Sequence, residues 1–254
     1  MNLIEKADRL RKRKNRVPIS ALTAYDYATA RLLDEAGVDL LLVGDSLGMV
    51  VFGYPDTTRV TLDHMTHHTE AVARGAKSAL ILGDLPINTY PDPQTAVANA
   101  RKLVKAGAQA VKLEGGLRQA EKVRAIIDAG IPVIGHLGML PQRVKEEGGY
   151  KKKGKTHDET QAILEGALAL QDAGVFAIVL ESVLPKASRL LTRELEVPTI
   201  GIGCGEGNCD GEIAVITDVI GSYPWFVPPF ATQRADVAGE ITKAVKGYLD
   251  ALSG

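Results

Sequence analysis

Polar side chains that could take part in binding or catalysis follow a series of short apolar segments in this sequence. The residues are Asp45, Ser46, Asp84, Lys112, Glu114, His136 and Glu181. Carboxylate oxygens are the ligands that Mg²⁺ prefers, and a lysine attracts an anionic substrate. A glutamate or a histidine can accept a proton during a reaction. Together these residue types favour a site that holds a hard cation and a small anion.

Each of these residues also has an ordinary structural explanation. Asp45 or Asp84 could cap the helix that follows it, as aspartate often does. Lys112 could form an ion pair with Glu114, because residues two apart on a strand share a face. His136 could be a hydrogen-bonded core histidine. Helix capping does not explain a lysine, a histidine and several carboxylates after successive segments, so the joint pattern favours a functional site.

The apolar segments themselves predict the fold. They cover residues 18–22, 40–43, 79–82, 110–113, 132–134, 176–180, 198–202 and 213–216. Continuous apolar runs are typical of strands buried on both faces, and helical segments between them imply a parallel sheet. We therefore predict an α/β protein with a single-domain (β/α)₈ barrel of the TIM type over residues 1–254, including a short N-terminal helix. The C-terminal ends of barrel strands converge on one mouth, which would bring the polar residues together.

Helix signals between the segments agree with this fold. The stretch 158–172 predicts a helix that ends at Gly174, and an Ala-Gly pair precedes an apolar run at 36–37, 106–107, 129–130 and 173–174. A doubly wound open sheet is the alternative fold. No G-x-G-x-x-G motif follows the first strand, which disfavours that alternative.

The composition of the chain limits the kinds of molecule that we expect the protein to bind. The net charge of −1 and the pI near 6.5 argue against nucleic-acid binding, so the expected partner is a small molecule. The lysine cluster at 151–155 is interpreted as a solvated surface. No apolar segment approaches the length of a membrane span and no signal peptide is recognisable, so we expect a cytoplasmic protein that does not bind membranes.

Two other residue groups are weaker candidates for a metal site. Cys204 and Cys209 have no second pair of cysteine or histidine partners, and we interpret them as two inert loop thiols. His64 and His68 have the i, i+4 spacing of a zinc-binding helix, but Met65 stands where the zinc-protease motif needs glutamate. A solvated helix face is the preferred interpretation of these histidines.

Several longer stretches together resemble the ketopantoate hydroxymethyltransferase family. They cover residues 22–27, 43–50, 83–86, 111–116, 135–142 and 198–203, in the order of the family, and the resemblance extends from about residue 3 to residue 220. It implies a barrel enzyme of pantothenate biosynthesis that transfers a hydroxymethyl group from 5,10-methylenetetrahydrofolate to 3-methyl-2-oxobutanoate, which forms 2-dehydropantoate. It also implies a homo-oligomer, since the family forms large assemblies that are often decamers.

The resemblance also implies a role for each candidate residue. Asp45, Asp84 and Glu114 would hold Mg²⁺, directly or through water, and Glu181 would be the catalytic base. The keto acid would be bound by residues of the same cluster: Asp45, Ser46, Asp84, Lys112 and His136. His136 matches an active-site histidine of the family whose role the sequence leaves open.

The sequence departs from the family pattern at some positions outside this cluster. Cys204 stands where the family has alanine, Leu184 where it has proline, Thr217 where it has histidine and Trp225 where it has lysine. Two other functions therefore stay open. One is another Mg²⁺-dependent enzyme of α-keto-acid carbon-carbon bonds, on a barrel like that of phosphoenolpyruvate mutase. The other is a non-catalytic protein that binds a keto acid. The presence of Glu181 beside both aspartates argues against this second alternative.

Overall fold

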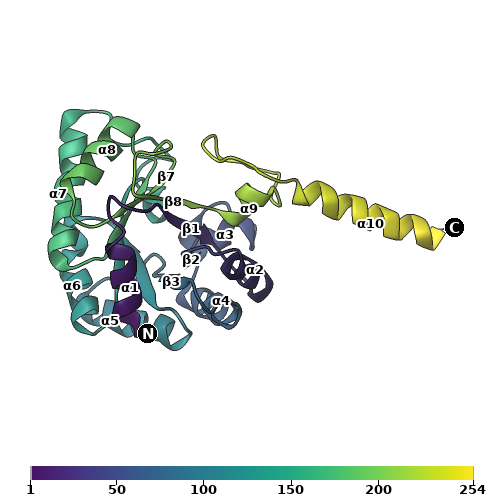
Figure 1. Ribbon diagram of the computed structural model, residues 1–254, viewed down its shortest axis with the longest axis horizontal. Coiled ribbons are helices and arrows are strands. Elements are labelled where there is room, and N and C mark those ends of the chain that lie inside the picture. The colour runs from purple at the N-terminus through teal and green to yellow at the C-terminus, as the bar shows by residue number, and fades with distance from the viewer. Residues whose placement is uncertain (1, 254) are drawn as a thin grey trace. The chain divides into compact units, whose positions relative to one another are not determined.

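The computed structural model describes residues 2–253, and its central feature is a closed parallel barrel (Figure 1). The strands are β1 (Ile19–Thr23), β2 (Leu40–Val43), β3 (Leu80–Asp84), β4 (Ala110–Glu114), β5 (Val133–Gly138), β6 (Ala177–Glu181), β7 (Thr199–Ile202) and β8 (Gly211–Ala214). Each strand pairs in parallel with the next along the chain. The predicted (β/α)₈ barrel of the TIM type is confirmed.

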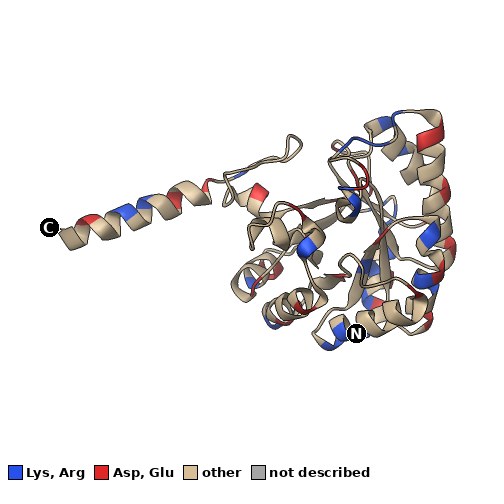
Figure 2. Ribbon diagram, turned by 180° about the vertical axis from the view of Figure 1, so that it is seen from behind, with Lys and Arg blue, Asp and Glu red and all other residues tan. Residues whose placement is uncertain are grey.

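Helices connect most of the strands. They are α1 (Leu3–Arg11), α2 (Tyr27–Glu35), α3 (Leu47–Val50), α4 (Leu62–Gly75), α5 (Pro93–Lys105), α6 (Ala120–Asp128), α7 (His157–Ala173), α8 (Pro185–Glu194), α9 (Ile216–Ile220) and α10 (Val237–Ser253). Short 3₁₀ turns lie at Thr57–Arg59, Leu117–Gln119 and Pro141–Arg143. Residues 203–210, between β7 and β8, form a loop without a helix. Figure 2 shows Lys and Arg interspersed with Asp and Glu along the outer helices.

The helix ends follow from local sequence. The side chain of Thr156 accepts a hydrogen bond from the Glu159 N–H at the start of α7, and Gly174 ends this helix with a φ of 102°. The glycine of every predicted Ala-Gly pair has a left-handed backbone conformation: Gly37, Gly107, Gly130 and Gly174. Glycine adopts this conformation without steric cost, which explains why the pair recurs where a helix turns back into a strand.

The last strand begins earlier than the apolar pattern predicts, at Gly211 rather than at Ile213. A Cβ atom at position 211 would lie 2.4 Å from the Ile19 carbonyl oxygen. Closure of the barrel between β8 and β1 therefore requires glycine here. This residue carries no apolar signal, so hydrophobicity alone places the start of the strand too late.

Helix α1 covers the N-terminal end of the barrel. Its side chains Ala7 and Leu10 belong to the same buried cluster as Ile19, Leu40 and Ala110, which are the first residues of β1, β2 and β4. The predicted short N-terminal helix therefore closes the end opposite the C-terminal mouth. That mouth is where the functional groups of such barrels lie.

The chain divides into two compact units, one up to Ile213 and the other from Ala214 onward. The prediction of one domain over residues 1–254 therefore stays a prediction. Within the second unit, α10 carries large apolar side chains that are more than half exposed: Ile241, Val245, Tyr248, Leu249 and Leu252. Among residues 2–253, no helix is both long enough and apolar enough to cross a membrane.

Candidate active site

The register of the barrel strands brings the predicted residues together at the C-terminal mouth. Asp84 on β3 lies opposite Lys112 on β4, and Glu114 on β4 lies opposite His136 on β5. Glu181 ends β6, where it lies opposite Gly138. Because side chains alternate along a strand, Lys112 and Glu114 share one face of β4.

Lys112 lies between two carboxylates in the buried part of the site. Its Nζ is 2.6 Å from Asp84 Oδ2 and 3.7 Å from Glu114 Oε1, and all three side chains are at most 5% exposed. Burial alone lowers the pKa of Lys112, but the charges of Asp84, Glu114 and Asp45 outweigh burial and raise the pKa above its ordinary value. The lysine is therefore charged, and its nearest partner is Asp84 on the neighbouring strand rather than Glu114 on its own.

Asp45 adds a further buried carboxylate at the end of β2. Its backbone N–H donates to Asp84 Oδ2 at 3.4 Å. Burial, together with the charge of Asp84, raises the pKa of Asp45 well above its ordinary value. Burial also raises the pKa of Asp84, although Lys112 opposes this shift. Acidic groups that destabilise each other's charge are a feature of functional sites.

The oxygens of these carboxylates suit a hard cation. Asp84 Oδ1 is buried and has no hydrogen-bond partner among the described residues, whereas the buried Glu114 Oε1 faces Lys112 Nζ at 3.7 Å and His136 Nδ1 at 3.3 Å. A buried oxygen without a partner needs an explanation, and an ion is one. Residues 2–253 contain no group of three or more His, Cys, Asp or Glu side chains arranged to hold a metal. Mg²⁺ does not need such a group, because it commonly binds one or two carboxylates and keeps water or substrate oxygens as its other ligands.

His136 connects the buried cluster to Glu181. Its Nδ1 is 3.3 Å from Glu114 Oε1, and its Nε2 is 3.2 Å from Glu181 Oε2. Burial and Lys112 lower the pKa of His136, but Glu114 and Glu181 outweigh them and raise it to about 9. The imidazole is therefore positively charged at neutral pH.

This charge makes the stability of the protein depend on pH in a defined direction. Because the folded-state pKa of His136 is raised above 6.5, its contribution is fully present below pH 6.5 and is lost as pH rises through about 9. The shift corresponds to about 3 kcal/mol of unfolding free energy. Urea unfolding with a chelator present, at pH 6 and pH 9.5, should show this loss for the unaltered protein. The loss should be absent from His136→Gln, and an equal loss in both proteins would contradict the assignment.

Glu181 is the most exposed of the ionisable groups in the cluster, with 15% of its side chain accessible. Its carbonyl oxygen accepts a hydrogen bond from the Met139 N–H at 2.8 Å. The next residue, Ser182, has a φ of 52°, which is uncommon for a residue other than glycine. Gly138 packs so closely that a Cβ there would lie 2.3 Å from the Glu181 carbonyl oxygen. The backbone around Glu181 is thus fixed from several sides.

Gly138→Ala should therefore damage both stability and activity. The alanine must adopt a left-handed φ, which costs about 1–3 kcal/mol, and its Cβ must also displace the Glu181 carbonyl. Gly37→Ala is a matched control, because Gly37 has a φ of 85° and no atom within 4 Å of the added Cβ. We expect the control to lose stability alone and Gly138→Ala to lose roughly 10²-fold in rate as well. Urea unfolding and steady-state rates test this, and equal rates for the two variants would be the contrary result.

Ser46 also lies at the mouth, directly after Asp45. Its Oγ is 2.8 Å from the Tyr25 hydroxyl. Two residues to which the sequence interpretation gave no role reach the same cluster. Gln142 donates from Nε2 to Asp45 Oδ2, and the Tyr90 hydroxyl donates to Gln142 Oε1. Gln142 ends one of the stretches that carry the family resemblance, whereas no sequence pattern indicates Tyr90.

The alternative histidine and cysteine sites do not join this cluster. His64 accepts from the Thr61 N–H through its Nδ1 at the start of α4, and the rings of His64 and His68 pack against Phe52. Cys204 and Cys209 are free thiols. The hydrogen bond from Cys209 lowers the pKa of Cys204 to about 6, although burial opposes it, and only 2% of Cys204 is exposed.

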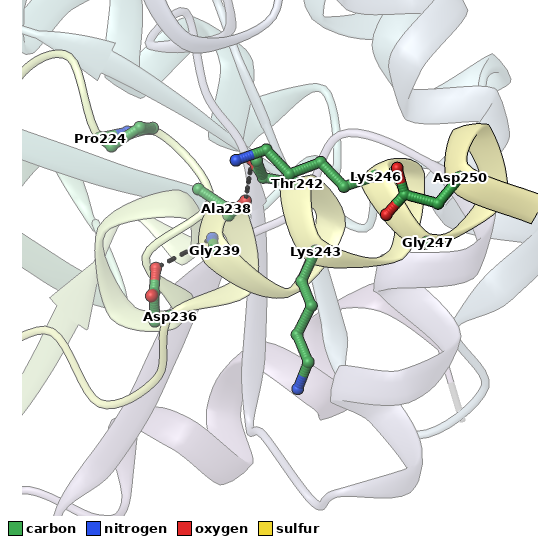
Figure 3. Close-up of a pocket in the computed structure, with 9 residues that line it drawn as sticks. All are labelled: Pro224, Asp236, Ala238, Gly239, Thr242, Lys243, Lys246, Gly247 and Asp250. Atoms are coloured by element: carbon green, nitrogen blue, oxygen red, sulfur yellow. Dashed lines mark hydrogen bonds between the residues drawn. The ribbon is translucent and has the colours of Figure 1, made fainter. Parts of the chain in front are cut away.

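A pocket in the second unit contains none of the predicted residues (Figure 3). It is lined by Pro224, Asp236, Ala238, Gly239, Thr242, Lys243, Lys246, Gly247 and Asp250. The side chain of Asp236 accepts a hydrogen bond from the Gly239 N–H, and Thr242 donates to the Ala238 carbonyl. These contacts stabilise the start of α10.

A closed (β/α)₈ barrel with carboxylates, a lysine and a charged histidine at its C-terminal mouth defines a class of enzyme that acts on small anionic molecules. The family model described as ketopantoate hydroxymethyltransferase matches residues 5–253. The chain therefore belongs to the ketopantoate hydroxymethyltransferase family, which consists of transferases of pantothenate biosynthesis.

Three curated relatives match this chain over most of their own length, and each carries the name 3-methyl-2-oxobutanoate hydroxymethyltransferase. The protein of Ignicoccus hospitalis is 52% identical over 244 residues, which are 96% of this chain and 92% of the relative. The protein of Acetivibrio thermocellus is 51% identical over 243 residues, with 95% and 86% covered. That of Aeropyrum pernix is 51% identical over 245 residues, with 96% and 89% covered.

Solved structures with low sequence identity share the fold. A phosphonopyruvate hydrolase in complex with oxalate and Mg²⁺ has a TM-score of 0.64 at 16% identity, covering 85% of this chain and 81% of that chain. A 2,3-dimethylmalate lyase of the PEP mutase/isocitrate lyase superfamily has a TM-score of 0.62 at 18% identity, with 98% and 87% covered. At these identities the likeness establishes the barrel architecture.

Proposed function

We propose that this protein is a cytoplasmic enzyme that transfers a hydroxymethyl group from 5,10-methylenetetrahydrofolate to 3-methyl-2-oxobutanoate. The keto acid, the folate and water would give 2-dehydropantoate and tetrahydrofolate. The observation that carries the proposal is the continuous charged cluster from Asp84 through Lys112, Glu114 and His136 to Glu181. It occurs in a chain that is about half identical to relatives named for this reaction.

The metal in this proposal is Mg²⁺, held by Asp45, Asp84 and Glu114 directly or through water. The donor set supports it, because it consists of oxygens and includes Asp84 Oδ1, a buried oxygen without a hydrogen-bond partner among the described residues. The phosphonopyruvate hydrolase with the same fold was solved with Mg²⁺ and oxalate, a small dicarboxylate. When bound, the ion would polarise the keto carbonyl and stabilise the negative charge of the enolate.

Lys112 and Ser46 would bind the keto acid. Asp84 accepts one of the three N–H donors of the Lys112 ammonium, so that another can reach a substrate carboxylate. The pairing with Asp84 also keeps the ammonium charged in a buried place. Ser46 Oγ, next to the Tyr25 hydroxyl, supplies a neutral hydrogen-bonding group beside Asp45.

Glu181 would remove the proton from C3 of 3-methyl-2-oxobutanoate. Its Oε2 faces the charged His136 at 3.2 Å, which orients the carboxylate and leaves Oε1 to accept the proton. The resulting carbon nucleophile would attack the methylene carbon of the folate as the bond from that carbon to one folate nitrogen breaks. Water would then displace the second nitrogen and leave its hydroxyl on the methylene carbon. The proton taken by Glu181 and the remaining proton of water would go to the two nitrogens of tetrahydrofolate. His136 would hold the base in position, and its contact with Glu114 fixes the ring in turn.

Product formation tests the proposed function most simply. The purified protein, supplied with 3-methyl-2-oxobutanoate, methylenetetrahydrofolate and Mg²⁺, should form 2-dehydropantoate, and omission of any one component should stop it. Cleavage of an α-keto acid without folate would instead indicate a carbon-carbon lyase. Binding of the keto acid without any turnover would indicate a non-catalytic protein.

We also propose that the protein is a homo-oligomer and that it forms a decamer, as members of the family often do. The exposed apolar side chains along α10, from Ile241 to Leu252, support association through burial of this face. Light scattering on the eluting protein should give a mass several times that of the 27.1 kDa chain. A mass equal to one chain would exclude the oligomer.

A further inference from the structure

Gln142 lies at the centre of the candidate site but has no role in the proposed catalytic steps. It lies in the 3₁₀ turn Pro141–Arg143 after β5 and is 3% exposed. Its backbone N–H donates to Glu114 Oε2 at 3.1 Å. Its Nε2 donates to Asp45 Oδ2 and to the Leu85 carbonyl, both at 3.0 Å. A single buried glutamine therefore joins the ends of β2, β3 and β4.

These hydrogen bonds orient the two carboxylates of Asp45 and Glu114. Gln142 binds one oxygen of Asp45 and one oxygen of Glu114. The other oxygen of Glu114, Oε1, faces Lys112 Nζ at 3.7 Å and His136 Nδ1 at 3.3 Å. Gln142 thus fixes the rotation of each carboxylate through one oxygen. Partners of this kind orient metal ligands and typically change metal affinity when they are removed.

Tyr90 fixes which way the amide of Gln142 points. Its hydroxyl donates to Gln142 Oε1 at 2.5 Å, so the NH₂ group must face Asp45 and Leu85. The reversed amide would place an oxygen against the Asp45 carboxylate. Tyr90 is itself placed by the turn after β3, in which Asn88 has a φ of 66° and the Thr89 N–H donates to the Pro86 carbonyl.

We propose that Gln142, oriented by Tyr90, is a positioning residue that holds Asp45 and Glu114 for the cation of the active site. The inference rests on the proposed function only for the identity of the cation as Mg²⁺. The hydrogen bonds themselves define the role, because they engage both donors of the side-chain amide, its acceptor and the backbone N–H.

The test measures binding of Mn²⁺, as a paramagnetic probe for Mg²⁺, by electron paramagnetic resonance in the presence of 3-methyl-2-oxobutanoate. Gln142→Met keeps the length of the side chain and the backbone donor to Glu114 but removes the amide. We expect its Mn²⁺ dissociation constant to rise by about 10–100-fold. Tyr90→Phe removes the donor that orients the amide, together with the contact of the same hydroxyl to the Glu114 backbone, and keeps the amide of Gln142. We therefore expect a smaller rise in the same direction.

Gln119→Met is the matched control. Gln119 is also a buried glutamine in a loop after a barrel strand, at 4% exposure, and it accepts from Lys122 rather than contacting a carboxylate of the site. We expect its Mn²⁺ affinity to equal that of the unaltered protein even where its melting temperature falls. This comparison separates positioning of the ligands from a general loss of packing.

Wild-type Mn²⁺ affinity in Gln142→Met, or an equal loss in Gln119→Met, would overturn the proposal. If Gln142→Met does not fold, the Tyr90→Phe variant serves as the test. Unchanged Mn²⁺ affinity in that folded variant would reject the positioning role of Gln142, and weakened affinity would support it. The product assay on the unaltered protein keeps the two proposals separate. A protein that binds Mn²⁺ through Gln142 but forms no 2-dehydropantoate would refute the proposed function and leave the positioning role intact.

Discussion

Replacement of Glu181 by glutamine is expected to lower the rate of 2-dehydropantoate formation by about 10²–10⁴-fold, the loss typical of a missing general base. The amide keeps the size of the side chain and can still accept a hydrogen bond from His136 Nε2, 3.2 Å away in the native protein. Binding of the keto acid should therefore survive, because the cluster of Asp45, Asp84 and Lys112 is untouched. Steady-state rates and titration calorimetry measure the two effects separately.

Glu165→Gln provides the control for Glu181→Gln. Glu165 is an exposed residue of the outer helix α7, so the same chemical change there should leave the rate unchanged. If Glu181→Gln binds the keto acid and turns over at the rate of the unaltered protein, Glu181 is not the base. His136 would then be the first candidate, since it contacts Glu181 and Glu114 within the same cluster.

Lys112→Met should lower both keto-acid binding and the free energy of unfolding. The change leaves Asp84 and Glu114 buried without their cation, and breaking a buried ion pair costs about 3–5 kcal/mol. The ammonium of Lys112 is buried between two carboxylates, so urea unfolding should show a large loss.

A double variant tests the contribution of the ion pair to stability. Lys112→Met combined with Asp84→Asn removes both charges of the pair, so it should recover much of the stability, and keto-acid binding is judged in the single variant because Asp84 is itself a proposed metal ligand. Lys14→Met is the control for ion-pair loss, because Lys14 Nζ pairs with Asp210 Oδ2 at 2.8 Å outside the cluster. It should lose stability and keep binding. A Lys112→Met variant that loses stability but binds the keto acid normally would assign Lys112 a structural role only.

The fold could be predicted because barrel strands are buried on both faces. Such strands form continuous apolar runs, and the predicted segments at 40–43, 110–113 and 176–180 overlap β2, β4 and β6 closely. The start of β8 could not be predicted in this way, since Gly211 and Glu212 are not apolar. Gly211 is selected by the close approach of Ile19, a contact between residues far apart in the sequence.

The residues of the candidate site could be predicted as a group, but most of their contacts could not. The pair of Lys112 with Glu114 on its own strand could be anticipated and is present at 3.7 Å. The closer contact with Asp84 follows from strand order, which the sequence does not show. Gln142 and Tyr90 lie in loops whose course depends on backbone conformations such as the left-handed φ of Asn88. Hydrophobic patterns contain no information about such turns, so only the structure shows the contacts of these two residues.

The most direct test of the central claim is exchange of the C3 proton of 3-methyl-2-oxobutanoate by the unaltered protein in D₂O. In the proposed mechanism, deprotonation by Glu181 would need the keto acid and Mg²⁺ but not the folate. Proton NMR should therefore show loss of the C3 signal and collapse of the methyl splitting when folate is omitted. The same mixture with Glu181→Gln should exchange about 10²–10⁴-fold more slowly. Absence of exchange in the unaltered protein, under conditions where it binds the keto acid and forms 2-dehydropantoate once folate is added, would contradict deprotonation at this site as an independent first step.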